Sequence, residues 1–420
     1  MSDPRITSEF VEALPKTDLH VHLDGSMRIP TLIDLAQEYG VHLPSYTESG
    51  LRDLVFKDRY ANLGEYLQGF AFTVAVMQSE VALERCAYEL AQDNQQEGVR
   101  YLEVRFAPQL HCHAHMQAVM VLKAVNRGLQ RAQREFNLTP AVKDGLEPPF
   151  KYGIIVCAMR KFSRNFSEYY KNLINAHRHA PGKELYAMAS LEMARAAIEA
   201  RDEHGLPVVG FDLAGEEAGY PAGDHMLAFT HAHKNFLKKT VHAGEAYGPE
   251  SIFQAITELY ADRIGHGTYL LDPGMITDQE IEDRQQYVGQ LGQYIADRRI
   301  TLEICLTSNL QTNPHMKSLK DHSFRRLREA RLSTTICTDN RLMSNTTVTN
   351  ELMLAVEHLN LDLHDLKSII IYGFKRSFMP GSYLDKRAYV RQVIDYYEGV
   401  ERRFLSDEVQ STPQSSRIRE

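Results

Sequence analysis

The sequence predicts an α/β chain folded as a (β/α)₈ barrel of the TIM type, with helical insertions and a metal site at the carboxyl ends of its strands. Eight short β-rich runs alternate with longer helical stretches, and this alternation is typical of a parallel barrel. Several runs are almost continuously apolar, as expected of strands buried on both faces. No GxGxxG follows the first run, which disfavours a doubly wound sheet.

The eight expected strands lie at regular intervals along the chain. In order they are Thr17–His22, Arg100–Phe106, Tyr152–Ala158, Val208–Leu213, Thr240–His242, Asp262–Gly265, Thr301–Cys305 and Ser333–Cys337. The fifth and sixth are short, and their pattern alone is weak. Helical segments separate the runs; Leu185–Arg201, for example, is rich in Ala, Met, Leu, Glu and Arg and contains no Gly or Pro, as a helix favours.

The chain has 420 residues, more than the roughly 250 typical of such barrels. We expect one barrel domain over 1–405, with 26–95 as a helical insertion after the first strand. The segment 159–205 is also long. The polar stretch 406–420 is expected to form a flexible tail.

Composition excludes several classes of partner. The chain carries 47 Lys and Arg against 55 Asp and Glu, a formal net charge of −8, which suits a polyanion such as nucleic acid poorly. No stretch reaches the roughly 20 apolar residues that span a bilayer, so we expect no membrane partner. The sequence leaves the oligomeric state open.

The cysteines favour a reducing compartment. There are five of them, widely spaced and without a CxxC pair, so neither a disulfide framework nor a thiolate zinc site is indicated. The first residues lack the layout of a secretory signal. We therefore expect a cytoplasmic protein.

Histidine is abundant, with 18 residues, and position in the barrel separates the candidate metal ligands. His20 and His22 close the first strand, where residues i and i+2 point to the same side. His242 closes the fifth strand, and Asp339 follows the eighth. Catalytic groups of such barrels lie at the carboxyl ends of the strands. Three imidazoles and one carboxylate suit one Zn²⁺, with a remaining position for water.

Other histidine pairs compete less well. His177 and His179 lie in a polar stretch that reads as a surface loop. His231 and His233 would face different directions on a helix. The histidines at 111, 113 and 115 follow the second strand, and a second metal site there stays open.

Two further residues follow consecutive strands. Glu245 comes three residues after His242, and the intervening Gly244 allows the backbone to turn tightly toward the same cavity. His266 ends the sixth strand with a glycine on each side, which permits close backbone approach. A capping glutamate and a core histidine are the alternatives for each alone. Together, beside a metal ligand, they favour a hydrolytic site.

These motifs together resemble the adenosine deaminase family, metal-dependent purine deaminases with a (β/α)₈ fold. The matching segments, in order, are His20–Gly25 (HVHLDG), Glu103–Pro108 (EVRFAP), Phe211–Glu216 (FDLAGE), His242–Glu245 (HAGE), Ile264–Gly267 (IGHG), Ser308–Asn309 and Thr338–Asn340 (TDN). Seven motifs in register are a strong match.

The resemblance implies hydrolysis of adenosine and 2′-deoxyadenosine to inosine and ammonia. It implies one Zn²⁺ per chain, and the implied ligands are His20, His22, His242 and Asp339. It further implies that Glu245 protonates the purine ring, that His266 deprotonates and orients the attacking water, and that Asp339 also accepts a hydrogen bond from it. The implied substrate contacts are the backbone of Gly215 at N3 and Asp24 at the 5′ end of the ribose.

Two positions depart from the family pattern. Asn340 stands where many members carry a second acid, and its amide can donate to purine N7 without titrating. Leu306 replaces a proline near Ser308, which affects only local backbone shape. Asp24 favours a nucleoside over free adenine, although it could instead cap the following helix.

Other functions remain as alternatives. The chain could deaminate adenine or another 6-aminopurine, or it could be a catalytically inactive nucleoside-binding protein. The H-x-E and P-C-x-x-C signature of cytidine deaminases is absent. At the end of the fourth strand, Asp212 and Leu213 stand where two-metal barrels carry a bridging lysine, which favours a single metal.

Overall fold

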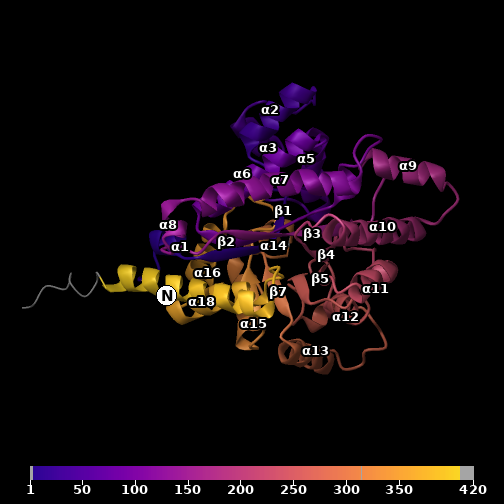
Figure 1. Ribbon diagram of the computed structural model, residues 1–420. Helices are drawn as coiled ribbons and strands as arrows, with labels where there is room; N and C mark the ends of the chain where they lie inside the picture. Colours follow the sequence, from indigo (N-terminus) through magenta and orange to yellow (C-terminus); the bar gives the residue numbers. More distant parts are fainter. Residues whose placement is uncertain (1–2, 314, 407–420) are drawn as a thin grey trace, which may run out of the picture.

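The computed structural model describes residues 3–313 and 315–406 and has the predicted barrel architecture (Figure 1). Eight parallel strands pair in chain order from β1 to β8, so all eight predicted strands are confirmed, the two weak ones included. Their bounds are β1 Lys16–His22, β2 Val99–Phe106, β3 Lys151–Met159, β4 Val208–Ala214, β5 Lys238–Ala243, β6 Arg263–His266, β7 Thr301–Ile304 and β8 Thr334–Ile336.

The main chain of one site residue brings the ends of the sheet together. The N–H of Asp339, just beyond β8, donates to the carbonyl of His20 at 2.7 Å, and the N–H of His22 donates to the carbonyl of Asp339 at 2.7 Å. Val21 and Asp339 thereby form a parallel bridge between the first strand and the segment after the last. The barrel is closed at its carboxyl end by the same residues that the sequence predicts as ligands.

Helices surround the strands. Their bounds are α1 Ser8–Ala13, α2 Ile29–Tyr39, α3 Glu48–Leu54, α4 Leu63–Tyr66, α5 Phe70–Val76, α6 Glu80–Gln96, α7 Ala118–Asn137, α8 Pro140–Lys143, α9 Glu168–Ala176, α10 Gly182–Asp202, α11 Met226–Lys234, α12 Pro249–Thr257, α13 Arg284–Arg298, α14 Leu306–Thr312, α15 Phe324–Glu329, α16 Val348–Leu359, α17 Leu363–Arg376 and α18 Tyr383–Ser406. Short 3₁₀ turns lie at Leu67–Gly69, Pro108–Leu110, Ala222–His225, Pro273–Met275 and Leu319–Asp321.

The extra length lies where the sequence has its longest intervals between strands. Helices α2 to α6 occupy the interval between β1 and β2, and α2, α3 and α5 stand at the top of the view in Figure 1. Between β3 and β4 lie α9 and α10, and α10 contains the predicted helix Leu185–Arg201. The expected tail lies outside the described residues, apart from Ser406 at the end of α18.

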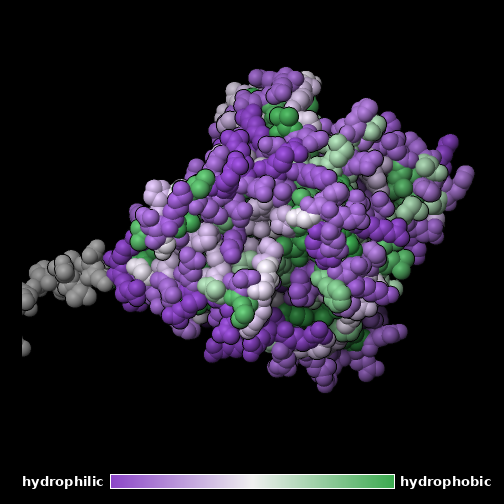
Figure 2. All heavy atoms as spheres, in the orientation of Figure 1, coloured by the Kyte–Doolittle hydropathy of each residue, from purple (hydrophilic) through white to green (hydrophobic). Residues whose placement is uncertain are grey.

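The strands are buried as their composition predicts. Every residue of β1, β2 and β4 is buried, which fits strands covered on both faces. On the face seen in Figure 2, polar side chains predominate and apolar ones gather in small groups. In the described part of the chain, no helix has the length and apolarity needed to cross a membrane.

Helices α6 and α7 pack so closely that one glycine is required between them. A Cβ at Gly128 of α7 would lie 2.2 Å from the carbonyl oxygen of Glu84 and 2.8 Å from the backbone nitrogen of Tyr88, both on α6. Because these are backbone atoms, the two helices would have to move apart. We expect Gly128→Ala to lower the free energy of unfolding by about 1–3 kcal/mol, measured by urea denaturation followed by circular dichroism.

The matched control is Gly289→Ala in α13, where a Cβ meets no atom within 4 Å. There alanine should stabilise the helix by up to about 1 kcal/mol. Equal stabilities for Gly128→Ala and the parent would contradict the close packing.

Candidate metal and active site

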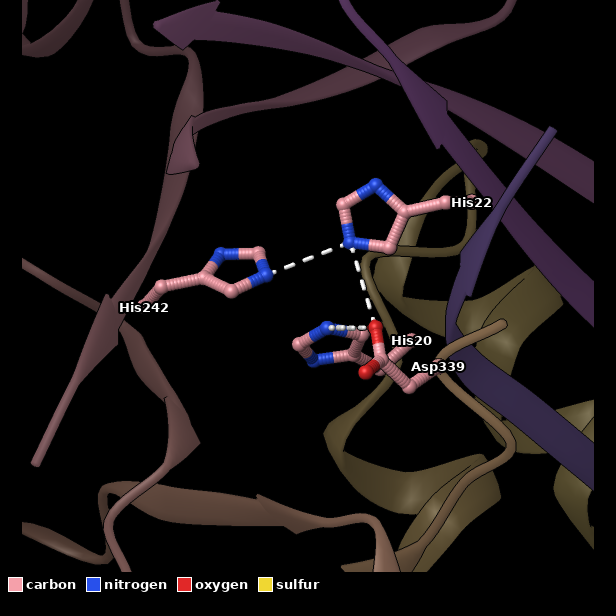
Figure 3. A group of neighbouring side chains, drawn as sticks. All are labelled: His20, His22, His242 and Asp339. Atoms are coloured by element: carbon pink, nitrogen blue, oxygen red, sulfur yellow. Dashed lines mark hydrogen bonds and ion pairs between the residues drawn. The ribbon is translucent and has the colours of Figure 1, made fainter. Parts of the chain in front are cut away.

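Four side chains from three separate parts of the barrel converge on one point (Figure 3). His20 and His22 come from β1, His242 from β5 across the barrel, and Asp339 from the segment after β8. Their ligand atoms all lie within 4.8 Å of one another. Nε2 of His22 lies 3.2 Å from Nε2 of His242, and Nε2 of both His20 and His22 lies 3.4 Å from Oδ1 of Asp339. Ligands about 2 Å from one tetrahedral metal ion are separated by similar distances.

Hydrogen bonds on the far side of two rings leave their lone pairs facing this point. Nδ1 of His20 donates to Oε2 of Glu303 at 2.8 Å, and Nδ1 of His242 donates to Asp212 at 3.2 Å. An ionised carboxylate only accepts, so each Nδ1 carries the hydrogen, and in the neutral ring that binds a metal each Nε2 holds a lone pair. Nε2 of His20 is buried without a hydrogen-bond partner. A buried lone pair of this kind fits a cation, and such outer carboxylates are typical of metal-binding histidines.

One guanidinium joins the two carboxylates. Arg105 donates from Nη1 to Asp212 at 3.0 Å and from Nη2 to Glu303 at 2.8 Å, and all three side chains are fully buried. Although burial opposes a charge on Arg105, the charges of Glu303 and Asp212 hold its pKa above the ordinary value. His20 and His242 are thus oriented through a single shared cation. No role was predicted from the sequence for Arg105, Asp212 or Glu303.

Glu245 and His266 lie beside the cluster, as predicted. Burial, together with the charge of Asp339, raises the pKa of Glu245 to about 8, which favours the protonated form of its carboxyl group near neutral pH. Oε2 of Glu245 lies 3.7 Å from Nε2 of His266. His266 and Asp339 both have left-handed backbone, with φ of 65° and 60°. This conformation is unusual outside glycine and concentrates at functional sites.

The site opens into a cavity of about 590 Å³, a size typical of small-molecule sites. Every predicted site residue except His20 lines it, namely His22, Asp24, Gly215, His242, Glu245, His266, Asp339 and Asn340. Oδ1 of Asp24 is buried without a hydrogen-bond partner, so it is available to a ligand. Oδ1 of Asn340 is also buried without a partner, but it lies against Gly25. Burial also raises the pKa of Asp24 to about 7.

The alternative role for Asp24 as a helix cap is wrong. Helix α2 begins at Ile29 with Arg28 at its N-cap, and no side chain caps it. The glycine at position 25 is required for a steric reason, because a Cβ there would lie 1.9 Å from Oδ1 of Asn340. The turn after β1 therefore brings Asp24 and Asn340 to the same wall of the cavity.

The histidines after β2 are occupied elsewhere. Nδ1 of His111 bonds to the carbonyl of Met77 at 3.0 Å, and Nε2 of His113 bonds to the carbonyl of Gln78 at 3.2 Å. His115 is exposed. Within residues 3–313 and 315–406, the metal-type groups are the cluster in Figure 3 and one on the surface at Asp362, His364 and Asp365. No second metal group forms at 111–115 among these residues.

A buried acid that the sequence analysis missed holds the loop bearing Glu245. The carboxylate of Glu217 accepts hydrogen bonds from four consecutive backbone N–H groups and one hydroxyl, those of Gly244 at 2.9 Å, Glu245 at 3.0 Å, Ala246 at 2.7 Å, Tyr247 at 3.1 Å and Ser251 at 2.5 Å. The family motif Phe211–Glu216 (FDLAGE) ends one residue before Glu217. A second acid directly after a strand-end glycine was the available signal.

The Ser308–Asn309 motif serves the two sides of the site. Oγ of Ser308 donates to Oδ2 of Asp339 at 2.6 Å, and the side chain of Asn309 meets Nδ1 of His266 at 3.1 Å. Both come from the first turns of α14. Adjacent residues therefore hold a predicted ligand and a predicted catalytic residue.

Solved structures share this fold at low sequence identity. An amidohydrolase from Burkholderia ambifaria with bound Zn has a TM-score of 0.75 at 18% identity, covering 97% of this chain and 98% of that one. The N6-methyl-AMP deaminase of Arabidopsis thaliana has a TM-score of 0.69 at 24% identity, covering 94% and 98%. An adenine deaminase from Arthrobacter aurescens has a TM-score of 0.68 at 19% identity, covering 92% and 99%.

Sequence comparison is more specific. The adenosine deaminase of Mycolicibacterium vanbaalenii is 36% identical over 93% of this chain and 96% of its own length. Adenosine deaminase 1 of Streptomyces coelicolor is 35% identical over 97% and 93%. The family model for adenosine deaminase matches residues 15–180 and 145–396. The chain therefore belongs to the adenosine deaminase family.

Proposed function

We propose that this protein is a zinc-dependent hydrolase that deaminates adenosine and 2′-deoxyadenosine to inosine and ammonia. The observation that carries the proposal is the meeting, in one cavity, of a cluster fit for a cation with a buried acid, Glu245, whose pKa is raised to about 8. Hydrolysis at a ring carbon needs an activated water and a proton for the ring. The relatives named adenosine deaminase, with alignments over nearly the whole chain, support adenosine as the substrate.

We assign the cation as one Zn²⁺ held by His20, His22, His242 and Asp339. Three imidazoles and one carboxylate match its ligand preference, and burial lowers the pKa of His22 so that its ring is a neutral ligand. When bound, zinc lowers the pKa of a coordinated water from about 15.7 toward roughly 7.

The protein's own residues direct the reaction. Glu245 donates its proton to purine N1, which removes aromatic character from the ring as C6 is attacked. His266 lies against the attacking water and orients it, and Asp339 accepts a hydrogen bond from that water. Substrate is held by Asp24 at the 5′ hydroxyl, by the backbone of Gly215 at N3 and by the amide of Asn340 at N7.

We also propose a cytoplasmic location, and we weigh two rival functions. All five cysteines are free, which fits a reducing cytoplasm. The cluster, Glu245 and His266 are all present, which argues against an inactive nucleoside-binding protein. Adenine as the preferred substrate is the remaining rival, and substrate comparison separates the two.

Zinc content tests the ligand assignment. Elemental analysis of the dialysed protein should give about one equivalent of zinc per chain, and His242→Ala should lose it. His113→Ala is the control and should keep the metal, because His113 lies outside the cluster. Two tightly held equivalents in the parent would contradict a single site.

Glu245→Gln tests the proton donor. The amide has nearly the same shape but cannot give up a proton, so we expect adenosine turnover to fall by about 10²–10⁴-fold. Zinc content and circular dichroism should stay at the parent values. A variant within a few-fold of parent activity would remove Glu245 from this role.

Glu217→Gln tests the loop that presents Glu245. A neutral amide offers one oxygen to donors that now share two charged ones, so N–H groups would be left unpaired. We expect turnover to fall about 10-fold or more and the free energy of unfolding to fall by about 1–3 kcal/mol, with zinc retained. Parent-like stability and turnover would show that the loop holds its shape without this carboxylate.

Loss of absorbance near the adenosine maximum tests the substrate. Adenosine and 2′-deoxyadenosine should be consumed far faster than adenine or AMP, because Asp24 can hydrogen-bond to a 5′ hydroxyl and offers no positive charge to a 5′ phosphate. Two cations that could balance a phosphate are engaged, since Lys161 of the cavity wall pairs with Glu216 and Arg28 pairs with Asp93. Asp24→Glu should erode the preference by intruding on the ribose. Equal specificity constants for adenine and adenosine would favour the rival function.

A further inference from the structure

Behind His266, a line of buried side chains leads away from the cavity. Its Nδ1 lies 3.1 Å from Nδ2 of Asn309, and Oδ1 of Asn309 lies 3.2 Å from Nε2 of His322. Nδ1 of His322 accepts from the backbone N–H of Phe324 at 3.0 Å. His322 follows the 3₁₀ turn Leu319–Asp321 and is only 3% exposed.

The direction of every hydrogen bond in this line follows from the last one. A backbone N–H can only donate, so Nδ1 of His322 must hold a lone pair. The ring is therefore neutral, with its hydrogen on Nε2; burial, which lowers the pKa of His322 to about 4, agrees. Nε2–H of His322 then requires an acceptor, which fixes the oxygen of Asn309 on that side.

The orientation of Asn309 determines the tautomer of His266. With its oxygen turned to His322, Asn309 presents its NH₂ group to His266. Nδ1 of His266 must accept, since an N–H there would meet another donor. The neutral ring consequently carries its hydrogen on Nε2, the atom that faces Glu245.

We propose that Asn309 and His322 are positioning residues that hold His266 in the Nε2–H tautomer, so that it presents a hydrogen-bond donor to the oxygen that attacks the substrate. The inference rests on the proposed deamination and changes the role of His266 within it. A neutral ring with its hydrogen on Nε2 orients the attacking oxygen in place of the deprotonation that the family resemblance implies, so the carboxylate of Asp339, which accepts a hydrogen bond from that water, takes its proton. Neither Asn309 nor His322 lines the cavity, so neither is proposed to touch the substrate.

Nuclear magnetic resonance of protein labelled with ¹⁵N-histidine tests the tautomer without any assay of activity. In the parent holoenzyme, His266, assigned by its loss in His266→Gln, should show a protonated Nε2 and an unprotonated Nδ1. A protonated Nδ1 would overturn the proposal. This measurement needs no variant of the line itself, so it stands even if such variants fold poorly.

Asn309→Asp should reverse the tautomer. Both carboxylate oxygens accept, so His322 keeps its bond while Nδ1 of His266 now has to donate. We expect the ¹⁵N signature of His266 to switch to protonated Nδ1, and turnover of adenosine to fall at least about 100-fold with KM within about 3-fold. Holding the wrong histidine tautomer costs about 10⁴-fold in a serine protease. An unchanged His266 signature, with the variant folded, would overturn the proposal.

The matched control is Asn313→Asp, the same change one helical turn further on. Asn313 donates to the hydroxyl of Tyr269 and not to His266, so the ¹⁵N signature of His266 and the turnover should stay at parent values. His322→Phe removes the fixed donor and should give His266 a mixture of tautomers. If the parent has the Nε2–H signature but does not deaminate adenosine, the proposed function fails while the tautomer assignment stands.

Discussion

The two hydrogen bonds that Arg105 donates, one to Glu303 and one to Asp212, are the constraint on which the rest of the site depends. These side chains come from β2, β7 and β4, and they reach His20 on β1 and His242 on β5. One guanidinium thus sets the distance between two imidazoles on opposite sides of the barrel. Burying such charges is expensive unless each is paired.

The pairing continues below the site, so that no charge in this group stands alone. Glu303 also accepts from Arg263 at 2.6 Å and from the hydroxyl of Thr240 at 3.0 Å, and Arg263 in turn pairs with Glu103. The barrel interior behind the site therefore contains a network of buried ion pairs, where branched apolar side chains dominate in many such barrels. Removing one member would leave another buried and unpaired, at a cost of about 3–5 kcal/mol.

Local pattern was enough to predict the strands and which side chains meet in the cluster of Figure 3, because both depend on short-range features. A short apolar run predicts a buried strand, and its last residue lies at the carboxyl end of the barrel whatever the neighbours are. The same logic found β6, although it has only 4 residues, the histidine that ends it and the acid that follows β5.

The supporting residues could not be predicted in this way. Arg105 and Glu303 are separated by 198 positions, and their partnership follows from how far each side chain reaches across the barrel. Asn309 and His322 depend on the direction of a single backbone N–H group. Asp24 was ambiguous for a related reason, since whether an acid after a strand caps a helix depends on where that helix begins.

The two kinds of histidine at the site differ in the group that stands behind each ring. A carboxylate behind Nδ1 accepts its hydrogen, which leaves Nε2 of His20 and His242 with lone pairs that suit a cation. An amide NH₂ behind Nδ1 donates, which by our inference leaves Nε2 of His266 with a hydrogen that suits an oxygen. Similar rings, within 5.3 Å of one another by centroid, can therefore act as metal ligands or as a hydrogen-bond donor. The residue that bonds to Nδ1 of each ring sets the chemistry of that ring. A sequence motif made only of the catalytic residues would not identify this partner.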